Sequence, residues 1–139
     1  MAQVDAVVSL VVYAKDRDAV ACFYAAELGL EAVDQSAEDD DFVILAGPGV
    51  ELTVVRIPES IAAGIAIASP PEVREDTPFK PSFLVPSLAA ARAAALSAGG
   101  RLQPEASEWR FRGYVQVDGL DPEGNVVQFR QLETASDPD

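Results

Sequence analysis

The chain has 139 residues, and its 23 Asp and Glu against 10 Lys and Arg give a formal net charge of −13. A field of this sign repels phosphate backbones and anionic lipid head groups, so the composition argues against nucleic-acid and membrane-surface binding. With 49% hydrophobic residues the chain can bury a core, and its length suits one domain or two small halves that share a core.

The sequence contains no histidine, and Cys22 is its only cysteine. Histidine is the usual acid or base of catalysis near neutral pH and the commonest transition-metal ligand, so His-containing triads and His/carboxylate metal sites are excluded. An all-oxygen site for a hard cation is still possible with 23 carboxylates. A lone cysteine forms no internal disulfide, and we see neither a basic leader nor an apolar stretch of spanning length. We therefore expect a cytoplasmic protein.

Periodicity in the first part of the chain predicts a strand, a helix and three further strands. Residues 4–14 are rich in Val, which indicates a buried strand. Asp16 can cap a helix over 17–28, whose apolar residues recur at helical spacing, and Gly29 can end it. Further strands are expected at 31–35, 42–46 and 50–56, with an acidic turn at 38–41 and a hairpin at Gly47-Pro48-Gly49.

The segment 57–79 interrupts this pattern with four prolines and a charged run, which is typical of a linker or a functional lid. The first pattern then returns. A strand over 80–85 precedes Ser87, which can cap an alanine-rich helix over 88–97. The remaining strands are expected at 101–104, 109–117 and 126–132, with a turn at 121–125 and a frayed tail at 134–139.

The two patterns indicate an internal duplication, because one sequence separation relates Asp16 to Ser87 and Gly29 to Gly100. Modules of roughly fifty residues are marginal alone. Each has one helix to cover one face of its sheet, so the other face needs a partner. We therefore predict an α+β fold in which two tandem βαβββ modules form a curved mixed sheet with a concave ligand-binding face.

Short motifs at both ends of the chain carry a family resemblance. The opening contains Ser-Leu-Val-Val-Tyr-Ala-Lys-Asp from Ser9, then Cys22-Phe-Tyr24 and Leu28-Gly-Leu30. The closing segment Asp-Pro-Glu-Gly-Asn-Val-Val-Gln-Phe begins at Asp121. In order and spacing these motifs resemble the glyoxalase/bleomycin-resistance/ring-cleaving dioxygenase superfamily, the vicinal oxygen chelate fold.

The resemblance implies a single glyoxalase-like domain built from module 3–56, linker 57–79 and module 80–133, and it implies a homodimer, because relatives of this fold are mostly dimeric. In metal-dependent members, four strand positions on the concave face hold a divalent cation with His and Glu side chains.

By position, those four ligands fall on Ser9 and Glu51 in the first module and on Lys80 and Gln128 in the second. Only Glu51 could bind a cation strongly, and the ammonium of Lys80 would occupy the place of the ion. The resemblance therefore implies a member that holds no metal and no other cofactor.

Alternation along two strands agrees with this placement. Glu51 and Thr53 share one face of their strand, and Gln128 and Arg130 share one face of theirs. Such polar residues face either solvent on an open sheet or a lined cavity. Trp109, the only tryptophan, is either a core aromatic or a stacking wall for a planar ligand, as in metal-free, drug-sequestering relatives.

Two functions are compatible with these residues. The first is a metal-independent small-molecule-binding protein whose ligand contacts Ser9, Glu51, Lys80, Trp109 and Gln128. The alternative is a glyoxalase-like lyase or isomerase in which Glu51 is the general base and Lys80 or an arginine stabilises an enolate-like charge. We also predict that Glu51 and Lys80 lie in direct or one-water contact, with Gln128 and Ser9 completing the polar patch.

Overall fold

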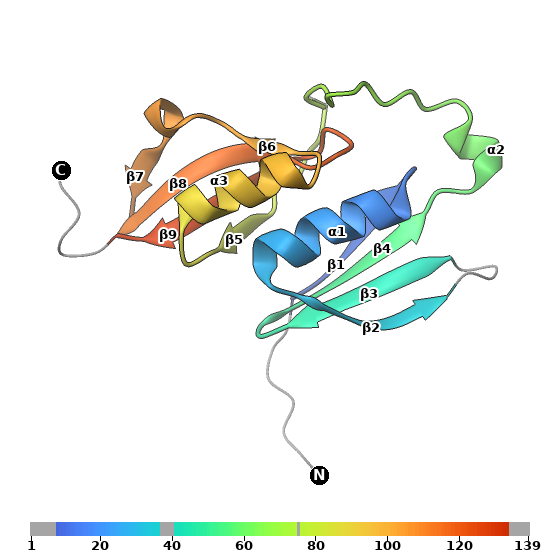
Figure 1. The fold of residues 1–139 in the computed structure, drawn as a ribbon, viewed down its shortest axis with the longest axis horizontal. Coiled ribbons are helices and arrows are strands. Elements are labelled where there is room, and N and C mark those ends of the chain that lie inside the picture. Colours follow the sequence, from blue (N-terminus) through green and yellow to red (C-terminus); the bar gives the residue numbers. More distant parts are fainter. Residues whose placement is uncertain (1–7, 37–40, 75, 134–139) are drawn as a thin grey trace, which may run out of the picture. The chain divides into compact units, whose positions relative to one another are not determined.

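The computed structural model describes residues 8–36, 41–74 and 76–133 and divides into two compact units, Met1–Ala66 and Ile67–Asp139. The boundary between the units falls inside the segment 57–79 that the sequence predicts as a linker. Each unit contains its own sheet of mixed parallel and antiparallel strands (Figure 1). The predicted α+β class is confirmed.

The sheet of the first unit has the strand order β1-β4-β3-β2, in which β1 runs parallel to β4 and the other neighbours are antiparallel. The helix α1 covers one face of this sheet (Figure 1), where Leu45, Leu52 and Val54 are buried. The elements of this unit are β1 (Val8–Ala14), α1 (Arg17–Leu28), β2 (Glu31–Ser36), β3 (Phe42–Gly47), β4 (Val50–Arg56) and the short α2 (Glu59–Ala62).

The sequence predicts these elements closely, with α2 as the exception. The helix and the last strand have the predicted bounds, and β2 and β3 each extend one residue further than predicted. The helix α2 was not predicted, because four residues among prolines show no periodicity. Residues 4–7 of the predicted first strand and 38–40 of the acidic turn lie outside the described residues.

Side-chain caps fix the start of both longer helices. The Asp16 carboxylate accepts the N–H of Ala19 at 3.0 Å, and in the second unit the Ser87 hydroxyl accepts that of Ala90 at 3.1 Å. Both predicted caps are confirmed. Gly29 ends α1 with a φ of 65°, but its counterpart after the second helix is Gly99, at 87°, and not Gly100 as the duplication predicts. No helix in the described parts of the chain is long and apolar enough to cross a bilayer.

The second unit has the strand order β5-β9-β8-β6, and β7 pairs with β8. The parallel pair is β5 with β9, which repeats the parallel pairing of β1 with β4 in the first unit. The helix α3 covers one face of this sheet (Figure 1), where Val117 and Phe129 are fully buried. The elements are β5 (Ser82–Leu84), α3 (Leu88–Ser97), β6 (Arg101–Leu102), a 3₁₀ helix (Glu105–Ser107), β7 (Trp109–Phe111), β8 (Tyr114–Leu120) and β9 (Val126–Leu132).

The predicted strand over 109–117 is wrong, because this segment forms a hairpin. The chain turns at Arg112 and Gly113, whose φ angles are 53° and 86°. Two successive residues with positive φ make the tight connection that antiparallel strands prefer, and glycine, asparagine or aspartate usually signals it. Because the first of these two positions is an arginine, the sequence does not indicate a turn here. The structure therefore has β7 and β8 where the sequence predicts one strand.

The predicted turn at 121–125 is confirmed, and it anchors part of the segment 57–79. The fully buried Asp121 carboxylate accepts the N–H of Glu123 at 2.9 Å and that of Asn125 at 3.0 Å. The carbonyl of Gly124 in turn accepts the N–H of Arg74 at 2.9 Å. Residues after the unit boundary therefore pack on the second unit instead of spanning freely between modules.

Candidate functional site

Each sheet has one face covered by its helix, and we call the opposite side its open face. In the first unit, Ser9 on β1 is the register partner of Glu51 on β4. On the other side of Glu51, its register partner is Ala46 on β3. Register partners point to the same side of a sheet, so the predicted shared face of Ser9 and Glu51 is confirmed. Glu51 is half-buried and makes no hydrogen bond or ion pair with any described residue.

Gln128 lies at the centre of the open face in the second unit. It pairs with Ser82 on one side and with Asp118 on the other, and the Ser82 hydroxyl donates a hydrogen bond to its Oε1 at 2.6 Å. This register corrects the sequence analysis, which set Lys80 at this position. Pro81 follows Lys80 and its carbonyl accepts the Gln128 N–H at 2.8 Å, so β5 begins two residues later than predicted.

Lys80 lies just before β5, and its side chain reaches the same open face, where it contacts Asp118. Its Nζ is 3.2 Å from Oδ1 of Asp118 and 5.9 Å from the centroid of the Trp109 ring. The two ionic side chains are about 42% and 34% exposed, so this pair is worth about 0–1 kcal/mol. Lys80 and Glu51 belong to different units, and their contact stays a prediction.

Trp109 belongs to this open face and not to the core. It is the register partner of Gln116 on β8, and 38% of its surface is exposed. The structure therefore brings three predicted site residues together in the second unit: Lys80, Trp109 and Gln128. The other two, Ser9 and Glu51, form a separate pair in the first unit.

Three further residues of the open face were missed as site residues. They are Asp118 and Tyr114 on β8 and Arg130 on β9, whose guanidinium carbon is 4.4 Å from the centroid of the Tyr114 ring. The signal was present, since Tyr114, Gln116 and Asp118 alternate with apolar residues and glycine. This alternation was not used to predict site residues, because the predicted strand over 109–117 ran through the turn at 112–113.

The side chains at the expected metal positions do not fit a resident divalent ion. The first unit offers one carboxylate, from Glu51, and one hydroxyl, from Ser9. The second offers the hydroxyl of Ser82 and the amide of Gln128, which already bond to each other. Nowhere in the described residues do three Asp, Glu or Cys side chains gather as ligands. Transition metals favour nitrogen or sulfur ligands, and hard cations need six or more oxygens.

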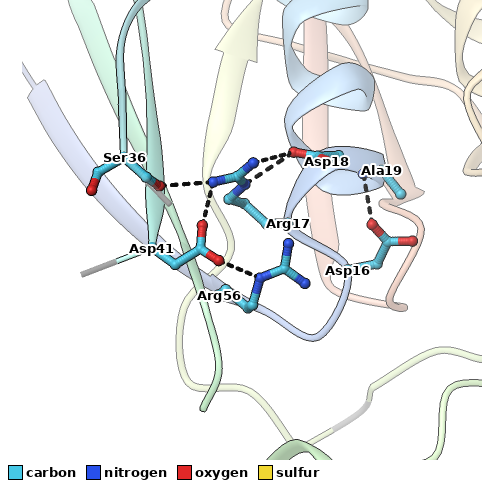
Figure 2. Close-up of polar contacts among 7 residues, drawn as sticks. All are labelled: Asp16, Arg17, Asp18, Ala19, Ser36, Asp41 and Arg56. Carbon is cyan, nitrogen blue, oxygen red and sulfur yellow. Dashed lines mark hydrogen bonds and ion pairs between the residues drawn. The ribbon is translucent and has the colours of Figure 1, made fainter. Parts of the chain in front are cut away.

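A second polar cluster, at one end of the first sheet, is structural (Figure 2). The buried Arg17 of α1 bonds to Asp41, to the Ser36 carbonyl at 2.9 Å and to Asp18 at 2.9 Å. The other oxygen of Asp41 accepts from Arg56 Nε at 2.6 Å, and this hydrogen bond raises the pKa of Arg56. Both carboxylate oxygens are occupied, so Asp41 joins α1 to the strands and is not the solvated turn residue that its acidic neighbours suggest.

Glu27 on α1 is a buried titratable residue that was not predicted from the sequence. It lies on the buried stripe of α1 with Val20 and Tyr24, is only 6% exposed, and neither carboxylate oxygen has a hydrogen-bond partner among the described residues. Burial raises its pKa from 4.5 to about 7. It faces the helix side of the sheet, away from the open face, so it takes no part in the candidate site.

Comparison with known proteins agrees with this architecture. None of the curated proteins matches the chain. Among solved structures, the fosfomycin resistance protein FosX from Listeria monocytogenes has a TM-score of 0.63 at 11% identity, covering 94% of this chain and 93% of that one. A FosX mutant complexed with Mn(II) and 1S,2S-dihydroxypropylphosphonic acid gives 0.63 at 12%, covering 96% and 95%.

A glyoxalase/bleomycin resistance protein/dioxygenase family enzyme from Burkholderia phytofirmans PsJN has a TM-score of 0.61 at 18% identity, covering 89% of this chain and 96% of that one. At these identities the likeness shows the fold alone. The sequence pattern of the glyoxalase-like domain family matches residues 9–129, most of the chain. The modules, their parallel strand pairings and this match lead to one conclusion: the chain belongs to the glyoxalase-like domain family, within the superfamily that the sequence motifs indicate.

Proposed function

We propose that this chain is a metal-independent small-molecule-binding protein, with its ligand on the open face of the second sheet. The observation that carries the proposal is the cluster of Lys80, Asp118 and Trp109 beside the bonded pair of Ser82 and Gln128. An exposed aromatic ring among a few fixed polar groups is the usual composition of a ligand site. The ring can stack on a planar ligand while the polar groups orient it.

The donor sets support binding without a metal. The FosX complex described above holds Mn(II) together with a phosphonic acid. In this chain the expected positions supply one carboxylate and otherwise neutral oxygens, which is too little negative charge to hold a divalent ion firmly. A ligand must then be recognised by direct contacts with side chains.

The alternative, a glyoxalase-like lyase or isomerase with Glu51 as the general base, has less support. A base that abstracts a proton next to a carbonyl needs a cation or a hydrogen-bond donor to stabilise the developing oxyanion. The register neighbours of Glu51 in its own sheet are Ser9 and Ala46, and neither carries a charge. Lys80, the cation assigned to this task, pairs instead with Asp118.

The proposal includes a homodimer in the cytoplasm. The strands β1 and β5 each lie at an edge of their sheet, where one row of backbone groups lacks a strand neighbour among the described residues. Such edges are prone to associate unless they are covered, and closed twofold dimers are the commonest protein assembly. The lone cysteine, which forms no internal disulfide, supports the cytoplasmic location as part of the proposal.

Native mass spectrometry of protein purified from its host tests the proposal directly. We expect a dimer mass without a stoichiometric divalent metal, and an additional small-molecule mass that disappears on denaturation. The same preparation should show no turnover of methylglyoxal hemithioacetal. A metal content near one per chain, or turnover that Glu51→Gln abolishes, would favour the enzyme.

A further inference from the structure

Arg130 is a cation on the open face of the second sheet that no carboxylate of the described residues neutralises. Its side chain is half-buried, its Nε is buried without a hydrogen-bond partner, and no described carboxylate forms an ion pair with it. The nearby acidic groups are engaged elsewhere: Asp118 contacts Lys80, and Glu133 contacts Arg110 at 2.8 Å. In a chain with a net charge of −13, an arginine without an ion-pair partner among the described residues requires an explanation.

The guanidinium of Arg130 is held in place by an aromatic ring. Its carbon lies 4.4 Å from the centroid of the Tyr114 ring, within the range of a cation–π contact. Stacking uses the flat face of the guanidinium and leaves the two terminal NH₂ groups at the edge for a ligand, while Nε is buried. Those N–H groups form a rigid fork that matches the two oxygens of a carboxylate.

An apolar hollow lies on the β5 side of the same sheet, beside the strand that carries Arg130. It has a volume of about 350 Å³ and is lined by Leu84, Val85, Pro86 and Leu132. Leu84 is the register partner of Arg130, so both point to the open face, and Leu84 and Leu132 are 55% and 57% exposed. A volume near the lower end of the usual range for ligand pockets suits a small molecule.

From this arrangement we infer that the ligand is a monocarboxylate with a compact apolar body, its carboxylate on Arg130 and its body in the hollow of Leu84 and Leu132. The inference rests on the proposed function and names the class of molecule that the open face binds. A single anionic group is matched to the single arginine of this face, which has no ion-pair partner among the described residues. An apolar body accounts for two leucines that the protein otherwise leaves in water.

Calorimetric titration with 2-naphthoate and with its neutral analogue 2-naphthamide tests the inference. We expect 2-naphthoate to bind with a stoichiometry of one per chain and more tightly than the amide. Arg130→Met should weaken 2-naphthoate roughly 10- to 100-fold, since it removes charge-assisted hydrogen bonds, and should leave the amide nearly unchanged. Arg130→Lys should give an intermediate loss, because it keeps the charge without the fork.

The matched control is Arg74→Met, which makes the same change of charge in the same unit, beside the turn at 121–125. It should leave the affinity for 2-naphthoate unchanged. Thermal melts of each variant show whether the fold is retained. Equal affinity for acid and amide, insensitivity to Arg130→Met, or no binding of 2-naphthoate to the wild-type protein would each overturn this inference. The proposed function is decided separately, by the small molecule and metal found on the protein purified from its host.

Discussion

Replacing Glu27 by glutamine should change how the stability of the protein depends on pH. The carboxyl group has a pKa of 4.5 in the unfolded chain and about 7 in the folded protein. Between these values the folded state holds a proton that the unfolded state has lost. Stability therefore falls as pH rises from about 4.5 to 7 and stays low above that, because the ionised carboxylate is buried without a hydrogen-bond partner.

The size of this loss follows from the shift in pKa. One pKa unit corresponds to about 1.4 kcal/mol, so the rise from 4.5 to about 7 corresponds to roughly 3 kcal/mol in the free energy of unfolding. Glu27→Gln removes the titration and keeps the shape. A buried amide without a partner still costs about 1–3 kcal/mol, but that cost is the same at every pH.

Urea denaturation of both proteins between pH 4.5 and 8.5 measures the effect. The difference between Glu27→Gln and the wild type should move in favour of the variant by up to about 3 kcal/mol as pH rises. Glu31→Gln is the matched control, since it removes one acidic charge from an exposed position on the next strand. If the difference for Glu27→Gln is constant across this range, or equals that for Glu31→Gln, the burial argument fails.

Four further predictions can be tested by measurements of stability and of oligomeric state. Gly124→Ala should destabilise the protein by about 1–3 kcal/mol more than Gly113→Ala. Both glycines have a positive φ, but only at Gly124 would an added Cβ overlap the carbonyl oxygen of Glu72. Equal losses of stability would contradict the packing of 67–74 on the turn. A double-mutant cycle with Lys80→Met and Asp118→Asn should give a coupling of about 0–1 kcal/mol, and a coupling of several kcal/mol would mean that the pair is dry. Chelator should leave the melting temperature unchanged, and a measurable drop would reveal a bound ion. Sedimentation should give a dimer, and a concentration-independent monomer of 14.7 kDa would exclude it.

Local chemistry explains why so much of the fold is predictable from the sequence. The bounds of α1 are set by Asp16 and Gly29, whose effects act within one helical turn. The strands β4 and β9 each begin soon after a glycine-containing turn and continue with alternating residues. Where the local signal is absent the prediction fails, and Arg112 shows this: it adopts a positive φ because the hairpin requires it, not because arginine favours it.

The candidate site is less predictable, because it depends on pairings between distant strands. Alternation alone places Gln128 and Arg130 on one face of β9. It cannot show that Asp118 and Ser82 are the neighbours of Gln128, since the register between strands is set by packing of the whole sheet. The contact of Lys80 with Asp118 was therefore not predicted, and the predicted contact of Lys80 with Glu51 of the other unit stays a prediction.

The net charge of the chain also bears on the ligand proposed here. At 0.1 M ionic strength charges are screened beyond about 10 Å, so most of the acidic surface acts weakly on an anion that has reached the open face. At about 4 Å from Arg130, with an effective dielectric constant near 20, the attraction is about 4 kcal/mol. A monoanion in contact with the guanidinium is therefore favoured locally, although the field of the whole chain repels it at long range. For a dianion the attraction to Arg130 and the long-range repulsion both double, but the second charge loses water without gaining a second cation in this cluster. A monocarboxylate therefore fits this face better than a phosphate ester.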